Sequence, residues 1–86
     1  MTMTDSPAWR RAADAKTQQA SQRNATLARE ALALLRGQDL PAEWVRVASV
    51  VAEGGRSWDE IAACLGMSKF KAAGMFRRLL VRADLR

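Results

Sequence analysis

Four residues that mark helix boundaries lie within twelve positions and constrain the fold more than any other feature of the chain. Ser57 and Glu60 have the spacing of a capping box, in which each side chain bonds a backbone N–H at the start of a helix. Gly66 suits the positive φ of a helix end, and Ser68 suits the cap of a following helix. The pattern predicts two short helices joined by a tight turn.

Similar boundary residues predict two further helices earlier in the chain. Gly37 ends one, Leu40-Pro41 begins the next, and Gly54-Gly55 ends it. The predicted helices run over about residues 25–36, 41–53, 58–65 and 69–83. Their apolar residues recur at helical spacing, at Leu27, Ala28, Ala31, Leu34 and Leu35, then Trp44, Val47, Ala48 and Val51, then Ile61, Ala62 and Leu65, then Ala72, Met75, Phe76 and Leu79. We therefore expect an all-α fold, a small helical bundle with one core.

The first 23 residues have a different pattern. Ser6-Pro7 is a suitable helix start, but Trp9 is the only large apolar residue over 8–24. A helix without an apolar stripe is marginal by itself. We predict an N-terminal arm over 1–23, partly helical or frayed unless a partner holds it, followed by a helical domain over 24–86.

The composition excludes most catalytic and metal chemistry. The chain has no histidine and one cysteine, Cys64, so it lacks an imidazole base, a Ser-His-Asp triad, a multi-thiolate metal site and an internal disulfide. We interpret Cys64 as a small, partly buried apolar filler, because no base can activate it as a nucleophile. The acidic pair Asp59-Glu60 is explained by helix capping. We expect no catalytic residue, no metal and no cofactor, and hence no enzyme.

The sequence also bears on the compartment. It has no run of about 18 apolar residues, the length needed to span a bilayer. Its N-terminus lacks the apolar stretch of a signal peptide. Together with the single cysteine, these features predict a cytoplasmic protein.

The positive charge is confined to one end of the chain. Fourteen Lys and Arg against nine Asp and Glu give a net charge of +5. Residues 1–65 carry eight basic and eight acidic side chains, so the excess lies entirely in Lys69, Lys71, Arg77, Arg78, Arg82 and Arg86 against Asp84. This excess predicts an anionic partner, either nucleic acid or a membrane surface. The alternative is a solvated basic helix end that complements the helix dipole.

Residues 58–77 have the layout of a helix-turn-helix. Ala62 is small where the two helices cross, Gly66 lies in the turn, and the interior positions hold Ile61, Leu65, Met67, Ala72 and Met75. In such a unit the second helix enters the DNA major groove, with its outward side chains against the base edges. We therefore predict a DNA-binding surface that comprises Ser68, Lys69, Phe70, Lys71, Ala73, Gly74, Arg77, Arg78 and Arg82, with Arg56 ahead of the unit.

Five of these residues are candidates for contact with bases. Lys69 and Arg77 can donate hydrogen bonds to guanine or to phosphate, and Phe70 can lie against a thymine methyl group. Ala73 and Gly74 allow a close approach. The alternative for Phe70 is packing against a neighbouring helix.

The other residues of the surface are candidates for contact with the DNA backbone. The helix start behind the Ser68 cap presents free N–H groups that suit a phosphate. The basic side chains expected to position the protein on the backbone are Lys71, Arg78, Arg82 and Arg56. Trp58 lies either against a sugar-phosphate or at the rim of the core.

Residues 39–84 carry a set of motifs that is found in a known family. The shared positions are Leu40-Pro41, Ser57, Glu60, Lys69, Ala73, Gly74, Arg77, Arg78, Leu79, Leu80 and Asp84. They resemble the C-terminal helix-turn-helix domain of WhiA-type sporulation regulators of Gram-positive bacteria. The resemblance implies sequence-specific promoter binding through the helix that begins at Lys69. Phe70, Lys71 and Met75 stand where the family has Asp, Ala and Arg, so the resemblance does not imply the same target sequence.

These features predict a protein that binds double-stranded DNA sequence-specifically, a small transcriptional regulator of bacterial or phage origin associated with the nucleoid. The alternative is a protein-interaction module that docks on RNA polymerase, a sigma factor or another regulator, which Trp9 and the apolar Phe70 suggest. Membrane-surface binding is disfavoured, because the inner face of the last helix is committed to a core.

The size of a DNA site bears on the oligomeric state. One recognition helix reads only a few base pairs, so a specific site usually requires a dimer. We expect a homodimer through residues 24–36, with Leu27, Leu34 and Leu35 in the seam.

Overall fold

The computed structural model describes residues 8–85, and it describes side chains from residue 18 onward. Over this range the elements are α1 (Ala8–Leu34), α2 (Ala42–Glu53), α3 (Trp58–Leu65) and α4 (Lys69–Arg82), and no strand is present among them. The prediction of an all-α fold is confirmed. The predicted start at Ser6-Pro7 lies outside the described residues.

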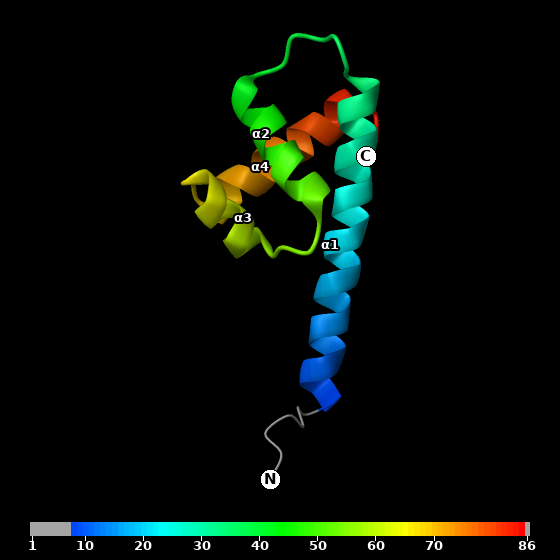
Figure 1. Cartoon of the computed structure of the whole chain (residues 1–86), viewed down its shortest axis with the longest axis vertical. Coiled ribbons are helices and arrows are strands. Elements are labelled where there is room, and N and C mark those ends of the chain that lie inside the picture. Colours follow the sequence, from blue (N-terminus) through cyan, green and yellow to red (C-terminus); the bar gives the residue numbers. More distant parts are fainter. Residues whose placement is uncertain (1–7, 86) are drawn as a thin grey trace.

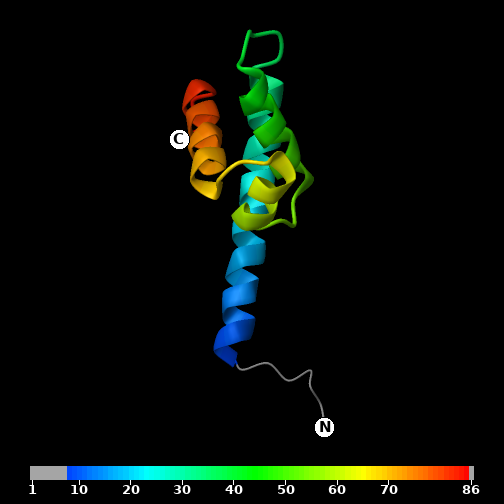
Figure 2. The ribbon, with the colours of Figure 1, turned by 90° about the vertical axis from the view of Figure 1, so that its left-hand side faces the viewer.

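The first helix is longer than the sequence pattern predicts. α1 runs without a break through residue 24, so residues 8–23 are helical and the helix expected over 25–36 is the C-terminal part of α1. Figure 1 shows this C-terminal part packed beside the other helices, while the N-terminal part projects away from them. The projection explains why the molecule measures 55 × 24 × 17 Å along its principal axes. Figure 2 shows the same projection from the side.

The core lies where α4 crosses the other helices. α4 contacts each of α1, α2 and α3, and its inner face is buried along the whole helix, at Ala72, Met75, Phe76, Leu79 and Leu80. α1 packs through the small residues Ala25, Ala28 and Ala31. Because these side chains are single methyl groups, the backbones of α1 and the other helices can approach closely.

The apolar faces predicted for the four helices are largely confirmed. The buried core contains Ala28, Ala31, Leu35, Val47, Ala48, Val51, Ile61, Ala72, Met75, Phe76 and Leu79, and Leu27, Trp44, Leu65 and Met67 pack partly buried against it. Leu34 differs, because its side chain is 59% exposed. At the end of α1, Ala31 and Leu35 face the core and Leu34 lies on the other side of the helix.

The predicted helix boundaries around the turn are confirmed. The backbone N–H of Ser57 donates to Glu60 Oε1 at 2.9 Å, and the N–H of Glu60 donates to Ser57 Oγ at 3.2 Å, which together form the capping box of α3. Gly66 ends α3 in the left-handed region with φ 67°. Ser68 Oγ accepts from the N–H of Lys71 at 3.1 Å at the start of α4. The direction of α4 relative to α3 is therefore set by local backbone geometry.

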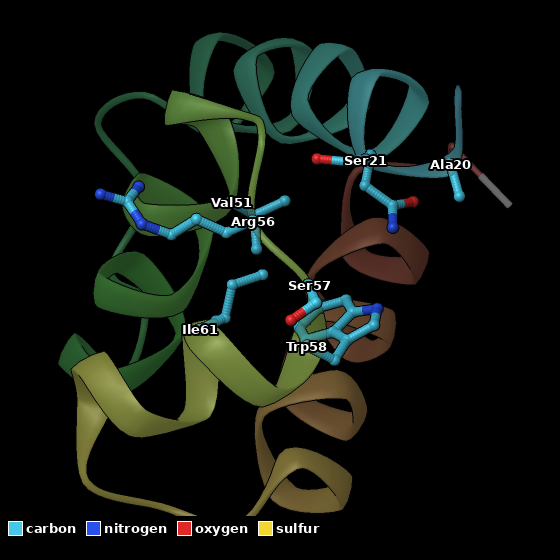
Figure 3. A pocket seen from close by; sticks show the side chains of 8 residues that line it. Ala20, Ser21, Val51, Arg56, Ser57, Trp58 and Ile61 are labelled. Atoms are coloured by element: carbon cyan, nitrogen blue, oxygen red, sulfur yellow. The ribbon is translucent and has the colours of Figure 1, made fainter. Parts of the chain in front are cut away.

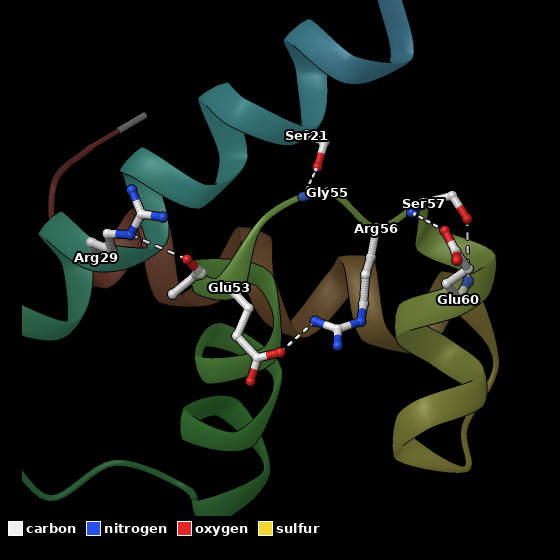
Figure 4. Close-up of polar contacts among 8 residues, drawn as sticks. Ser21, Arg29, Glu53, Gly55, Arg56, Ser57 and Glu60 are labelled. Atoms are coloured by element: carbon white, nitrogen blue, oxygen red, sulfur yellow. Dashed lines mark hydrogen bonds and ion pairs between the residues drawn. The ribbon is translucent and has the colours of Figure 1, made fainter. Parts of the chain in front are cut away.

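Two polar contacts hold the last turn of α2 and the segment that follows it against α1. The N–H of Gly55 donates to Ser21 Oγ at 2.8 Å, and Arg29 Nε donates to the carbonyl oxygen of Ala52 at 3.1 Å (Figure 4). Both contacts join residues that are more than twenty positions apart in the chain. They fix the end of α2 and the connection to α3 on α1.

We predict opposite effects on stability for alanine at two glycines. Gly66→Ala lowers the free energy of unfolding by about 1–2 kcal/mol, because a Cβ is strained in the left-handed region. Gly74→Ala raises it by about 0.5–1 kcal/mol, because Gly74 lies inside α4 with nothing within 4 Å of an added Cβ. Urea unfolding of both variants checks the pair. A loss of stability in Gly74→Ala would show that α4 needs this glycine for its own folding.

We also predict a pH dependence that arises from the capping box. Hydrogen bonds from the backbone N–H and side chain of Ser57 lower the pKa of Glu60. Because the pKa is lower in the folded state, the contribution of Glu60 to stability is present above its unfolded pKa of about 4.3 and is lost as the pH falls through the folded value. Glu60→Gln retains an acceptor oxygen but does not titrate in this range. Urea unfolding at pH 7 and pH 3 should therefore show a smaller loss of stability in Glu60→Gln than in the wild type, and equal losses would contradict this role.

Candidate nucleic-acid interface

The outer face of α4 carries most of the predicted DNA-binding residues. Phe70, Arg77 and Arg78 are exposed, and Ala73 and Gly74 are partly exposed between them. The structure thus brings these residues onto one side of a helix whose other side is buried. Phe70 is 80% exposed, which rules out the alternative that its ring packs against a neighbouring helix.

The start of α4 is electrostatically unusual for a helix. Its first turn contains no acidic residue but holds Lys69 and Lys71. The helix dipole disfavours cations at this end and favours anions. The N–H groups of Lys69 and Phe70 have no partner inside the helix, because the first turn has no preceding carbonyl groups. An anion bound here would satisfy these donors and offset the two lysines.

Acidic side chains from other helices lie beside these lysines, which the sequence pattern does not indicate. Lys69 Nζ is 3.6 Å from Asp59 Oδ1 of α3, and Lys71 Nζ is 3.8 Å from Glu43 Oε2 of α2. All four side chains are largely exposed, and pairs of this kind contribute little to stability. Lys69 Nζ also lies 5.6 Å from the centroid of the Phe70 ring. These ion pairs are therefore weak, and Lys69 and Lys71 can exchange their carboxylate partners for the phosphate of a bound ligand.

The arginines of α4 have a different environment. Arg77, Arg78 and Arg82 are exposed, and no acidic side chain within residues 18–85 forms an ion pair with them. Arg56 instead donates to the Glu53 carboxylate (Figure 4). This hydrogen bond and the charge of Glu53 raise the pKa of Arg56. The charge of Arg56 is thus offset locally, whereas the charges of the three α4 arginines are not.

Two further residues singled out from the sequence have clear positions. Cys64 is exposed, so its interpretation as partly buried is wrong. Ile61, Ala62 and Leu65 face the core from α3, and Cys64 falls on the outer side of this short helix. Trp58 is half-buried at the rim of the core, and its ring centroid lies 5.7 Å from that of Phe76 with the planes tilted by 54°.

Two other kinds of functional arrangement are absent from the described residues. No group of three or more Cys, Asp or Glu side chains that could hold a metal ion occurs there. No helix in residues 8–85 has the length and apolar character needed to cross a membrane.

Comparisons with models of protein families, with curated proteins and with solved structures found no match. The resemblance of residues 39–84 to the WhiA-type domain therefore stays a prediction.

Proposed function

We propose that this protein binds double-stranded DNA with the outer face of α4 in the major groove and acts as a small transcriptional regulator. The observation that carries the proposal is the combination on one helix face of Phe70 and Arg77 with the small residues Ala73 and Gly74, with Lys69 in the first turn of the same helix. Lys69 and Arg77 would donate to guanine or phosphate, and Phe70 would contact a thymine methyl group. The motifs shared with the WhiA-type domain support the same role for this helix.

Gly74 supports a close partner. A glycine inside a helix costs about 1 kcal/mol relative to alanine. Nothing lies within 4 Å of a Cβ built on Gly74, so packing inside the protein does not require a glycine there. A partner that comes close to the α4 backbone would explain why a glycine is present at position 74. The edges of bases in a DNA groove are such a partner.

The remaining charged residues suit the DNA backbone. Arg78, Arg82 and Lys71 extend from α4 beside the proposed reading residues, and the capped start of α4 at Ser68 suits a phosphate. Arg56 would contribute less, because Glu53 accepts its hydrogen bond. In this proposal Arg78, Arg82 and Lys71 position the protein on the DNA backbone, and Lys69, Phe70 and Arg77 specify the sequence.

A second candidate function is docking on another protein, such as RNA polymerase, a sigma factor or another regulator. The observation that favours it is the apolar character of part of the outer face. Phe70 is 80% exposed and Val81 is 63% exposed. The two are eleven residues apart, which is close to three turns of helix, so they lie on the same side of α4.

Dimerisation through residues 24–36 stays a prediction. Fewer of the leucines predicted to form the dimer contact are available on the surface than expected. Leu35 is buried in the core of the single chain, and Leu27 packs partly buried against that core. Leu34 is the one predicted seam leucine whose side chain is mostly exposed. A dimer through this segment would therefore form around Leu34.

We predict that in vitro selection from random duplexes recovers a defined DNA sequence. Lys69→Ala and Arg77→Ala should each weaken binding to this sequence by roughly 5- to 100-fold, because a good bidentate contact with a base discriminates by about 1–3 kcal/mol. Arg36→Ala is the matched control, since Arg36 is exposed after the end of α1 and is not among the proposed DNA-contact residues. Fluorescence anisotropy measures the affinities.

The selection also separates the two candidate functions. Failure to enrich any duplex, or equal losses in Lys69→Ala and Arg36→Ala, would contradict DNA reading by α4. In the docking alternative, Phe70→Ala and Val81→Ala would weaken binding to a protein partner without an effect on any duplex.

We further predict that removal of two acidic charges strengthens DNA binding. Glu43→Gln and Asp59→Asn release Lys71 and Lys69 from exposed ion pairs and remove repulsion of phosphate. The expected gain is about two- to fivefold for each variant, the range of an exposed ion pair. Glu30→Gln is the control, because Glu30 is exposed on α1. Unchanged affinity in both α4-adjacent variants would show that the first turn of α4 lies away from the DNA.

A further inference from the structure

A groove lies between α1, the start of α3 and α4, and Ala73 and Arg77 are the proposed DNA-contact residues that line it. It encloses about 450 Å³. Its lining is apolar and polar in about equal parts, with the apolar part formed by Leu27, Trp58, Ala73, Phe76, Leu80 and Leu85. We refer to this hollow as the Trp58 groove. Its volume is within the range of about 300–1,000 Å³ that is typical of ligand pockets.

Basic side chains stand at the rim of the Trp58 groove. Arg23 of α1 and Arg77 of α4 both line it and both are exposed, and Asn24 supplies a neutral amide beside them. No acidic side chain of the described residues lines the groove. The groove therefore combines an apolar floor with a positive rim.

A smaller hollow of about 170 Å³ adjoins the Trp58 groove. The two share Asn24 and Trp58, and the smaller one is lined on its other side by Arg56 and Ser57 (Figure 3). Figure 3 shows the Trp58 ring between the start of α3 and the neighbouring α4. The apolar and basic surface therefore continues past Trp58 along α1.

The residues that line the Trp58 groove suit some classes of ligand better than others. A DNA backbone presents charged phosphates, which need N–H donors and gain nothing from six apolar side chains. A large apolar side chain flanked by carboxylates would bury its apolar part on the floor and place its charges beside Arg23 and Arg77. The described surface of a second copy fits less well. Its two most exposed apolar side chains are Phe70 and Val81. Phe70 is flanked in the chain by Lys69 and Lys71, and Val81 is followed by Arg82, so either one would bring positive charge to the positive rim of the groove.

We propose that the Trp58 groove binds an acidic peptide segment of a partner protein. One aromatic or leucine side chain of the segment occupies the apolar floor, and its carboxylates pair with Arg23 and Arg77. This inference does not depend on DNA binding, because the groove exists in the free protein. Since Arg77 belongs to both surfaces, a bound segment would compete with DNA for this side chain.

Selection of random 12-residue peptides on the full-length protein in the absence of DNA tests the proposal. The expected consensus contains Trp, Phe or Leu together with two or more Asp or Glu residues. The best peptide is then synthesised and used as the probe, alongside a version with Asn and Gln in place of Asp and Glu. In ¹H–¹⁵N spectra the probe should shift the indole N–H signal of Trp58 and leave that of Trp44 unchanged, and the neutral version should bind more weakly.

Charge-reversal variants locate the binding site. Arg23→Glu should weaken probe binding by roughly 5- to 10-fold, which is the effect of losing one exposed ion pair and gaining repulsion. Arg36→Glu makes the same change of charge on an exposed residue outside the groove and should have no effect. Both positions are on the surface, and circular dichroism verifies that both variants fold.

Several outcomes would overturn the proposal. The first two are the absence of any enriched peptide and a consensus without acidic residues. The others are equal effects of Arg23→Glu and Arg36→Glu on probe affinity, and changes in the ¹H–¹⁵N signals that are confined to Phe70 and Val81. Self-association that Arg23→Glu abolishes would assign the groove to a second copy. A loss of duplex binding in Arg23→Glu without any peptide binding would assign it to DNA. Because the peptide assay contains no DNA, it can fail or succeed independently of the proposed regulator function.

Discussion

α4 packs against each of α1, α2 and α3, and this burial decides which of its side chains remain available to a partner. Five inner positions along the helix are committed to the core, and Leu79 is completely buried. The turn at Gly66 and the cap at Ser68 set the direction in which α4 leaves α3. Because position and rotation of α4 are both determined, Phe70, Gly74 and Arg77 face outward as a consequence of how the chain folds.

The distribution of charge in space differs from its distribution along the sequence. The last 21 residues hold the entire net charge of +5, yet the fold brings Asp59 and Glu43 to the first turn of α4. The positive charge of the first turn is therefore partly offset, whereas the charge of the arginines farther along α4 is not offset by an ion pair within residues 18–85. Arg77 lies where this surface meets the Trp58 groove, whose opposite rim carries Arg23. One arginine thus links the two surfaces that we propose for partners.

The sequence is sufficient to predict features that depend on near neighbours. The capping box of Ser57 and Glu60 and the left-handed Gly66 follow from local backbone chemistry, and the buried faces follow from helical spacing. Features that depend on tertiary contacts are not predictable in this way. The pair of Lys69 with Asp59 joins two helices across a turn, and the Trp58 groove needs residues from three helices. The exposure of Cys64 does not follow from spacing alone, because Cys64 lies three residues after the buried Ile61 and therefore next to the inner face of α3.

The salt dependence of duplex affinity tests the central claim that the exposed arginines and lysines of α4 bind DNA. Each neutralised phosphate contributes about −0.9 to the slope of log affinity against log salt concentration. If Lys71, Arg78 and Arg82 each contact a phosphate, the slope is about −3 or steeper, and Arg78→Ala makes it shallower by about 1. A slope near zero, or the same slope in Arg78→Ala, would contradict the account.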